Sequence, residues 1–597
     1  MNFAAFHHEP KSRMSYACDG KTIHVRVKTA KNDAARVSVR AVDPFNWRPA
    51  KEGSREYVFA VETIREIPMV KEATTDFHDI WFASISEFVW ARIRYGFVIE
   101  NHTERYFFGC HYTADLSGKE EEKDNVSNYF NFPYINEEDI YKAPDWVKHT
   151  IWYQIFPYSF CADGSECTRE RHGTLKGVLD RLDYLQDLGI NGIYFTPIFL
   201  SPSDHKYDTT DYFRVDDTFG TNETFGQLVE EAHKRGIKIM LDAVFNHCGY
   251  EHPFWQDVLK KGKNSEYYDC FYIVDHDKAP DDLIEVDGAE RCNYRTFGFT
   301  PTMPKWNTSH PVVREHLMQA AVYWAQQFHI DGWRLDVSNE VSHDFWREFR
   351  KRIKAVNPDI YILGENWDDS MPWLEGDQFD AVMNYEFMGP VWNFIGTMPV
   401  GKERKRAGNA TQFQNDMNEL MISYPRPLTS VMFNLLESHD TSRLMTVCEN
   451  IVEAAKLAYV IQMTFAGCPS IYYGGEIGMA GAEGDNRRPM TWHISDSQRA
   501  LKEHIRRLIH IRKQDPCLES VETAWHCADN DTGTVIYEKT CEGRSVYVIL
   551  HNRNAVDKIE LPESLRNREC TDIYREKRIV FDTELVLYPY EFYIVEA

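Results

Sequence analysis

Apolar and polar residues alternate with a period of two over the first 130 residues of the chain. His24-Val-Arg-Val-Lys28 and Arg36-Val-Ser-Val-Arg40 show the alternation most clearly, and further runs of this kind follow them. Such alternation predicts strands with one buried face. Because many short strands pack most simply as two facing sheets, we predict an N-terminal β-sandwich domain over residues 1–130.

From Thr150 onward the pattern changes to apolar runs that alternate with segments of helical spacing. The run Ile151–Phe156 reads as a strand, Leu175–Leu188 has helical spacing, and Gly192 opens the next strand. This order predicts parallel strands joined by crossover helices, so the fold class is α/β with a (β/α)₈ barrel. The remaining strands are expected at 237–242, 332–336, 361–365, 380–384, 431–434 and 469–473.

The third and fourth predicted strands lie unusually far apart. Asp242 and Asp336, at their ends, are 94 positions apart, whereas a βα unit needs only about a third of that length. Residues 248–305 are therefore predicted to form an insertion, and a long loop on this face of a barrel usually shapes access to a site.

The period of two returns after residue 514. Residues Thr534–Lys539 and Val546–His551 again read as strands, and the helical segment Gln498–Arg512 precedes them. We therefore predict a barrel domain over 131–513 and a second β-sandwich over 514–597.

Several predicted barrel strands end in acids, imidazoles or a guanidinium. Arg334 and Asp336 are two apart and share a face of their strand. Glu365 and Asp440 follow two later strands, and side chains at the carboxyl ends of barrel strands point into the active-site cup. A buried strand that ends in carboxylates is costly unless those groups have partners or a function.

Paired carboxylates of this kind suit glycoside hydrolysis with retention of configuration. Arg334 should keep Asp336 ionised as a nucleophile, and the apolar neighbours of Glu365 favour its protonated form. Two other interpretations exist for these acids. They could form a structural ion pair with Arg334, or they could ligate Mg²⁺ at successive strand ends, although a guanidinium in the same site would repel the metal.

Composition narrows the class of ligand and the compartment. A net charge of −25 disfavours nucleic acids and anionic membranes as partners. The 13 cysteines are scattered without a Cys-x-x-Cys pair, which predicts reduced thiols in a cytosol. The N-terminal residues lack a basic stretch followed by an apolar one, so no signal peptide is predicted. We therefore expect a cytoplasmic protein.

Five motifs in order along the chain resemble the α-amylase family of glycoside hydrolases. The resemblance is closest to its neopullulanase, cyclomaltodextrinase and maltogenic amylase subgroup. It covers nearly the whole chain and is tightest over residues 150–495. The motifs are Asp242–His247, Met303-Pro-Lys-Trp-Asn307, Gly332–Glu340, the segment around Glu365, and Phe433–Asp440.

The resemblance implies a role for each site residue. Asp336 would be the nucleophile, Glu365 the acid/base and Asp440 the stabiliser of the transition state. Trp306 and Trp367 could belong to the core, but both lie in predicted loops, so they are expected at the rim of the cup. The family pairs the arginine at Arg487 with an aspartate four residues earlier, where this chain has Glu483, or Asp485 after a shift in alignment. The residues expected to bind substrate are Tyr207, His247, Arg334, His439, Asp242, Trp367 and Arg487.

Related enzymes often carry a calcium-binding loop after the first strand. Here that loop offers only Asp163 and Glu166, whereas Ca²⁺ takes six to eight oxygen ligands. No metal site and no cofactor are therefore predicted, and a structural calcium is not favoured. A second departure is Asp368, which stands where the subgroup tends to have histidine, next to the acceptor side of the site.

The activity implied is retaining hydrolysis of α-1,4 bonds in cyclomaltodextrins, maltooligosaccharides and pullulan. The share of α-1,6 bonds is left open. An α-glucosidase or a transglycosylase of the same family is the alternative activity, and an amylase-like binding protein without catalysis is a further one. The partners implied are an oligosaccharide substrate and a second copy of the chain, in a homodimer formed through the N-terminal domain.

Overall fold

The computed structural model describes residues 1–86, 88–163, 165–168, 170–396, 398–400, 403–405 and 408–597. The chain forms two compact units, each described here by itself. The first joins Met1–Lys142 with Thr411–Thr429, and the second joins Ala143–Ala410 with Ser430–Ala597.

The first unit is a β-sandwich, as the alternating pattern predicts. Its core lies between the two sheets, and Val25, Val39 and Phe97 are among its fully buried residues. One sheet runs β1 (Ser15–Ala17), β2 (Ile23–Ala30), β8 (His78–Ile85) and β7 (Val70–Thr74); the other runs β11 (Thr113–Asp115), β10 (Arg105–Phe108), β9 (Ile93–Glu100), β3 (Arg36–Val42) and β6 (Arg65–Pro68), with β12 (Phe130–Phe132) also paired to β9.

Two short helices from the middle of the chain complete this unit, which the sequence patterns do not foretell. They are α9 (Ala410–Ile422) and α10 (Arg426–Thr429). Arg26 of β2 donates from Nη1 to the carbonyls of Ile422 and Tyr424, at 3.3 and 3.0 Å. Glu72 of β7 lies between two cations, with Arg26 Nε at 2.7 Å and Arg426 Nε at 2.9 Å from its carboxylate. A buried ion network therefore fastens the segment to the sandwich.

The second unit is built on a closed barrel of eight parallel strands, in which each strand pairs with the next and the last pairs with the first. The predicted barrel is thus confirmed. Its strands are β13 (Trp152–Ile155), β14 (Gly192–Phe195), β17 (Lys238–Ala243), β20 (Gly332–Leu335), β21 (Tyr361–Gly364), β22 (Ala381–Asn384), β25 (Phe433–Leu435) and β26 (Cys468–Tyr472).

The helices around the barrel follow the expected alternation, with one difference. The segment 175–188 is not one helix but two, α2 (Leu175–Leu179) and α3 (Leu182–Leu188), because the backbone of Arg181 leaves the helical region. Further helices are α4 (Asn222–Lys234), α6 (Pro311–Phe328), α7 (His343–Val356), α8 (Tyr385–Ile395), α12 (Val452–Thr464) and α13 (Asp496–Gln514).

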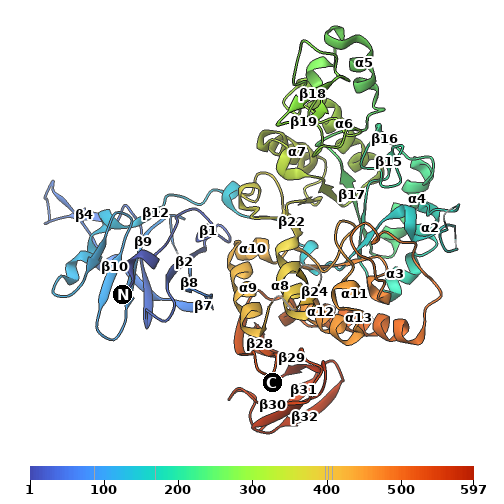
Figure 1. Ribbon diagram of the computed structural model, residues 1–597. Helices are drawn as coiled ribbons and strands as arrows, with labels where there is room; N and C mark the ends of the chain where they lie inside the picture. The colour runs from blue at the N-terminus through green and yellow to red at the C-terminus, as the bar shows by residue number, and fades with distance from the viewer. Residues whose placement is uncertain (87, 164, 169, 397, 401–402, 406–407) are drawn as a thin grey trace. The chain divides into compact units, whose positions relative to one another are not determined.

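The inserted segment between β17 and α6 forms a subdomain of its own, drawn in green in Figure 1. It contains α5 (Pro253–Lys261) and a hairpin of β18 (Leu283–Val286) and β19 (Ala289–Cys292). Trp255 and Trp306 are almost fully buried in it. The aromatic-rich insertion therefore has a packed core and is more than a loop.

The chain ends in a second all-β region, which is drawn in red in Figure 1. No helix in the described part of the chain combines the length and the apolar character needed to cross a membrane. No disulfide joins any of the 13 cysteines. The terminal sheets are β27 (Thr523–Asp529), β28 (Thr534–Cys541), β29 (Arg544–His551), β34 (Phe592–Glu596), β31 (Arg568–Asp572) and β32 (Lys577–Phe581), with β30 (Asp557–Glu560) paired to β33 (Glu584–Leu587).

Candidate active site

Three carboxyl groups meet at the carboxyl ends of the barrel strands. Asp336 directly follows β20, and its N–H donates to the carbonyl of Ala243 at 3.1 Å. Glu365 follows β21 and donates in the same way to the carbonyl of Leu335 at 3.0 Å. These bonds extend the ladder between strands, so the barrel itself positions both acids. With Asp440 they line a cavity of about 420 Å³.

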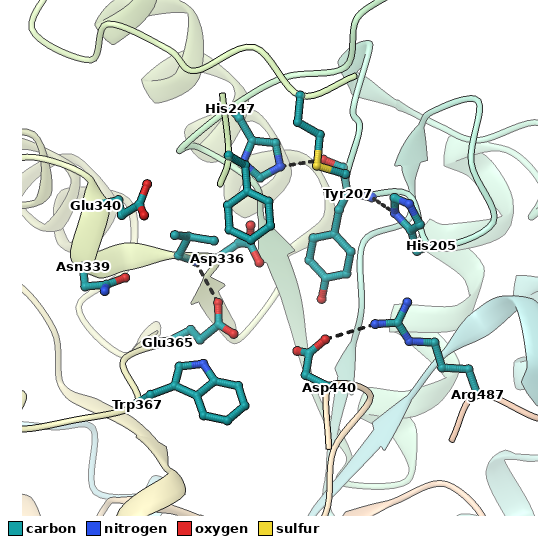
Figure 2. Close-up of a pocket in the computed structure, with 13 residues that line it drawn as sticks. His205, Tyr207, His247, Asp336, Asn339, Glu340, Glu365, Trp367, Asp440 and Arg487 are labelled. Carbon is teal, nitrogen blue, oxygen red and sulfur yellow. Dashed lines mark hydrogen bonds and ion pairs between the residues drawn. The ribbon is translucent and has the colours of Figure 1, made fainter. Parts of the chain in front are cut away.

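The cavity wall contains several of the residues proposed from the sequence, and Figure 2 shows their side chains turned toward a common space. Residues to which the sequence analysis gave no role also line it; Met303, Val337, Asn339 and Glu340 belong to the quoted motifs, whereas His205 and Phe297 lie outside them. The proposed residues in the wall are Tyr207, His247, Asp336, Glu365, Trp367, Asp440 and Arg487; the additional ones are His205, Phe297, Met303, Val337, Asn339 and Glu340.

Arg334 lies behind the cavity and joins three acids. Its Nη1 is 2.9 Å from Asp242 Oδ2 and 2.7 Å from Asp336 Oδ1. Its Nη2 is 2.8 Å from Glu365 Oε1, although the N–H bonds do not point along that contact. The guanidinium is completely buried, and Asp242 is too. One cation therefore serves three carboxyl groups in the barrel interior.

This arrangement affects the pKa of Asp336. Burial raises the pKa of Asp336 well above its usual value; Arg334 opposes the shift, while the charges of Glu365 and Asp242 reinforce it. Burial likewise raises the pKa of Asp242 against the influence of Arg334. Arg334 is therefore shared among three acids, and the expectation that it keeps Asp336 ionised stays a prediction.

The two oxygens of Asp336 have different surroundings. Oδ1 accepts a hydrogen bond from Arg334, whereas Oδ2 is buried and receives none from the described residues. Val337, the next residue, has a left-handed backbone with φ of 44°, which is strained for a β-branched side chain. This turn aims the N–H of Val337 at Glu365 Oε2, at 2.8 Å. The site thus holds an oriented carboxylate with one free oxygen beside a second, fixed carboxyl group.

Asp440 is kept charged by its neighbours. Burial raises its pKa, but His439, Arg334 and Arg487 outweigh burial and hold the pKa of Asp440 below its usual value. His439 Nε2 lies 3.0 Å from one oxygen and Arg487 Nη2 lies 3.0 Å from the other. Asp440 is therefore the carboxylate best placed to stay ionised beside a positive centre.

Arg487 does not use the partner that the resemblance suggests. Its guanidinium bonds to Asp440 and to the carbonyl of His439, whereas Asp485 pairs with the exposed Arg488. The preceding residue, Asn486, was missed by the sequence analysis. Its buried amide donates to the carbonyls of Ser438, His439 and Thr441, the last two at 2.7 Å. No motif marks it; only burial of a polar side chain distinguishes it.

A second network, of hydrogen bonds, joins the residues proposed to bind sugar. The hydroxyl of Tyr207 lies 2.5 Å from His439 Nε2 and donates to Asp242 at 3.1 Å, and the rings of Tyr207 and His439 are parallel. His247 Nε2 bonds to the carbonyl of Tyr207 at 3.1 Å. Burial lowers the pKa of His247 to about 3, so its ring is neutral and suited to hydrogen bonds with hydroxyl groups. Gln154 of β13, also missed, bonds to the other nitrogen of His439.

The two tryptophans expected at the rim behave differently. Trp367 is 46% exposed, lines the cavity, and stacks on Tyr385 with 3.7 Å between ring centroids. Trp306 is 1% exposed, so its placement at the rim is wrong. It packs against Phe271 and donates Nε1–H to the hydroxyl of Tyr212. Trp306 therefore packs in the aromatic core of the insertion.

The acids of the loop after β13 are engaged by protein donors. Glu166 accepts hydrogen bonds from the backbone of Trp492 and His493, at 2.7 and 3.2 Å, and Asp163 accepts one from Thr174. In the described part of the chain, no three His, Cys, Asp or Glu side chains gather in a way that would hold a metal ion. That no metal is needed stays a prediction.

We expect the melting temperature to be unchanged when EDTA is added in excess. The donors that already bind Asp163 and Glu166 leave these carboxylates little capacity for a cation, which would need six to eight oxygens. Differential scanning calorimetry with EDTA, and with Ca²⁺ restored, measures the effect. A fall of several degrees that Ca²⁺ reverses would show a calcium site.

Comparison with known proteins assigns the family. The model of the α-amylase catalytic domain matches residues 154–532, and that of the α-amylase N-terminal Ig-like domain matches residues 1–136. A cyclomaltodextrinase of Geobacillus thermopakistaniensis (strain MAS1) is 40% identical over the whole of both chains. Neopullulanase 2 of Thermoactinomyces vulgaris is 38% identical over 94% of each chain.

Solved structures agree with this assignment. A cyclomaltodextrinase structure superposes with a TM-score of 0.88 at 35% sequence identity, and the match covers all of both chains.

A further sequence relative, an intracellular maltogenic amylase of Bacillus subtilis, is 38% identical, and the alignment covers all of this chain and 99% of the relative. With catalytic and N-terminal domains both matched, and its acids gathered at the ends of the barrel strands, the chain belongs to the α-amylase family of glycoside hydrolases.

Proposed function

We propose that this protein hydrolyses α-1,4-glucosidic bonds in cyclomaltodextrins, maltooligosaccharides and pullulan, with retention of configuration. The observation that carries the proposal is the buried Oδ2 of Asp336, which has no hydrogen-bond partner among the described residues, in a residue that lines one cavity with Glu365 and Asp440. The names of the relatives, which include cyclomaltodextrinase, neopullulanase and maltogenic amylase, support this range of substrates.

The reaction would proceed by double displacement. Oδ2 of Asp336 attacks the anomeric carbon, and the bond to the leaving oxygen breaks as Glu365 gives that oxygen a proton. Glu365 then takes a proton from water, whose oxygen attacks the same carbon and releases Asp336. The charged Asp440 stabilises the oxocarbenium-like carbon in both steps.

We expect the first product released from β-cyclodextrin to have the α configuration. Two successive inversions at one carbon give net retention, as a covalent intermediate on Asp336 requires. Proton NMR in the first minutes, before mutarotation, measures the anomer. An initial β-anomer would contradict double displacement. Failure to hydrolyse β-cyclodextrin, pullulan and starch alike would overturn the proposed function itself.

A cytosolic location is part of the proposal. The chain's similarity to proteins named intracellular maltogenic amylase supports it, and so does the lack of disulfides among the 13 cysteines. An enzyme in the cytosol would meet short imported oligosaccharides rather than starch granules.

The proposed homodimer is supported by a hairpin of the N-terminal unit. Strands β4 (Trp47–Pro49) and β5 (Tyr57–Phe59) pair with each other outside the two sandwich sheets. Phe45 is 67% exposed, Trp47 54% and Tyr57 59%. These side chains are therefore exposed in this unit rather than buried in its core. An exposed group of large aromatic residues is typical of a protein contact.

Replacing Trp47 and Tyr57 together with Ser should convert the dimer into a monomer and raise activity on starch relative to cyclodextrin. The expected reason is loss of a dimer contact that restricts access to the site. Sedimentation velocity at micromolar concentration and assays on both substrates measure the two effects, and Phe77→Ser, which removes an aromatic that is 78% exposed, is the control. A wild-type protein that sediments as a monomer yet prefers cyclodextrin would contradict this mechanism.

A further inference from the structure

A second cavity lies in the inserted subdomain and adjoins the catalytic one. It has a volume of about 450 Å³, close to that of the catalytic cavity. Glu340 lines both cavities. Lys305 lines the second cavity, and its Nζ lies 3.2 Å from Glu340 Oε2. This ion pair therefore joins a residue of the second cavity to one that lines both.

One short loop supplies an aromatic ring to each cavity. Phe297 lines the catalytic cavity and stacks on His247, with 5.2 Å between ring centroids. Phe299, two residues later, lines the second cavity and is 75% exposed. A large exposed ring costs free energy in water, which a ligand that covers it would recover. The loop therefore offers apolar platforms on two sides.

The second cavity has the side chains that bind sugars. Phe299 is covered on one side by Arg291, whose guanidinium carbon is 4.0 Å from the ring centroid. Glu290, Arg295 and Lys305 add charged groups around the opening. An aromatic face beside guanidinium donors and a carboxylate acceptor matches a glucosyl unit, which has apolar C–H faces and a ring of hydroxyl groups.

The position of the second cavity relative to the acids indicates which part of a glucan would reach it. Glu365 protonates the leaving oxygen in the proposed reaction, so the leaving chain lies on its side of the cleaved bond. Figure 2 shows Asn339 and Glu340 on the side of Glu365 and Trp367, whereas His205 and Arg487 lie on the opposite side. A chain that leaves past Glu365 and Glu340 would run toward Phe299.

We propose that the cavity lined by Arg291, Phe299 and Lys305 is a remote subsite for the leaving-group end of long linear α-glucans. This inference rests on the proposed function and extends it, because it adds a preference for chain length. Short oligosaccharides fill the catalytic cavity alone. Longer ones also cover Phe299, which lowers KM for them without changing the chemical step.

Phe299→Ala is the test, with Phe77→Ala as a matched control on an exposed phenylalanine elsewhere in the chain. In Phe299→Ala, kcat/KM for maltodextrins longer than maltoheptaose should fall about three- to tenfold, the loss of one stacking contact. The value for maltotriose should stay at the wild-type level. Phe77→Ala should change neither. An equal loss on both substrates, or no loss on either, would overturn the subsite.

A binding measurement separates this inference from the proposed catalysis. Isothermal titration of long maltodextrin into Asp336→Asn, and into Asp336→Asn with Phe299→Ala, needs no turnover. The double variant should bind the long chain about three- to tenfold more weakly, while both variants bind maltotriose alike. Sedimentation of Phe299→Ala gives the remaining outcome: a change in oligomeric state would mean that the cavity holds a second copy of the chain, and would overturn the proposal.

Discussion

Asp336→Asn is expected to lower kcat by several powers of ten on every substrate and to leave the fold intact. An amide cannot form the covalent intermediate that the free oxygen of Asp336 is placed to form. Residual activity above about one hundredth of wild type would mean that another residue is the nucleophile. Initial rates on β-cyclodextrin measure the effect, with circular dichroism to show that the variant is folded.

The same variant should not lose thermal stability, and this separates catalysis from folding. Burial disfavours the charged form of Asp336, as its raised pKa shows, so an uncharged amide of the same size costs less in this position. We expect an unchanged or higher melting temperature. Asp485→Asn, an Asp-to-Asn change at an exposed residue that pairs with Arg488, is the matched control and should keep wild-type kcat.

Arg334→Met should both abolish activity and destabilise the fold by about 3–5 kcal/mol at neutral pH, since removal of one partner from a buried ion pair leaves uncompensated charge. Arg334 touches Asp242, Asp336 and Glu365 and is completely buried. Methionine fills most of the volume, so the loss reflects charge more than packing. Urea unfolding followed by circular dichroism measures it.

The pH dependence of that loss distinguishes charge from packing. Without the cation, the buried carboxyls bind protons in the folded state at pH values where they are ionised in the unfolded chain. A group with a raised folded pKa contributes its full stability below the unfolded pKa and loses it as the pH rises through the folded value. The deficit of Arg334→Met should therefore be smaller at pH 5 than at pH 8. Equal deficits at both would contradict the charge explanation.

The barrel was predictable because its strands are apolar runs bounded by helical spacing, and each run fell within one or two residues of a strand. Burial on both faces of a parallel sheet forces that composition. The acids were predictable for a related reason, since carboxylates at the ends of such runs need an explanation. Local pattern, however, says nothing about which of several acids contact Arg334, because that depends on distances in three dimensions.

Contacts between segments far apart in the chain could not be predicted from the sequence. Asn486 looks like any loop asparagine until its amide is found against three carbonyls that flank Asp440. Trp306 sits in a motif and was placed at the rim, yet the insertion has enough aromatic residues to bury it. The docking of 411–429 on the N-terminal sandwich leaves no periodic signal, since it depends on Arg26 reaching backbone carbonyls.

That docking has a consequence for synthesis of the chain on the ribosome. The sandwich residues end at Lys142, but the unit is complete only once Thr411–Thr429 has been made. Translation at roughly 5–20 residues per second leaves an interval on the order of tens of seconds. Throughout it, Glu72 has only one of its two arginines and the apolar side chains of Ala73 and Ile80 lack Ile422. Until Thr411–Thr429 is made, this part of the sandwich surface stays uncovered and is accessible to chaperones and to neighbouring nascent chains.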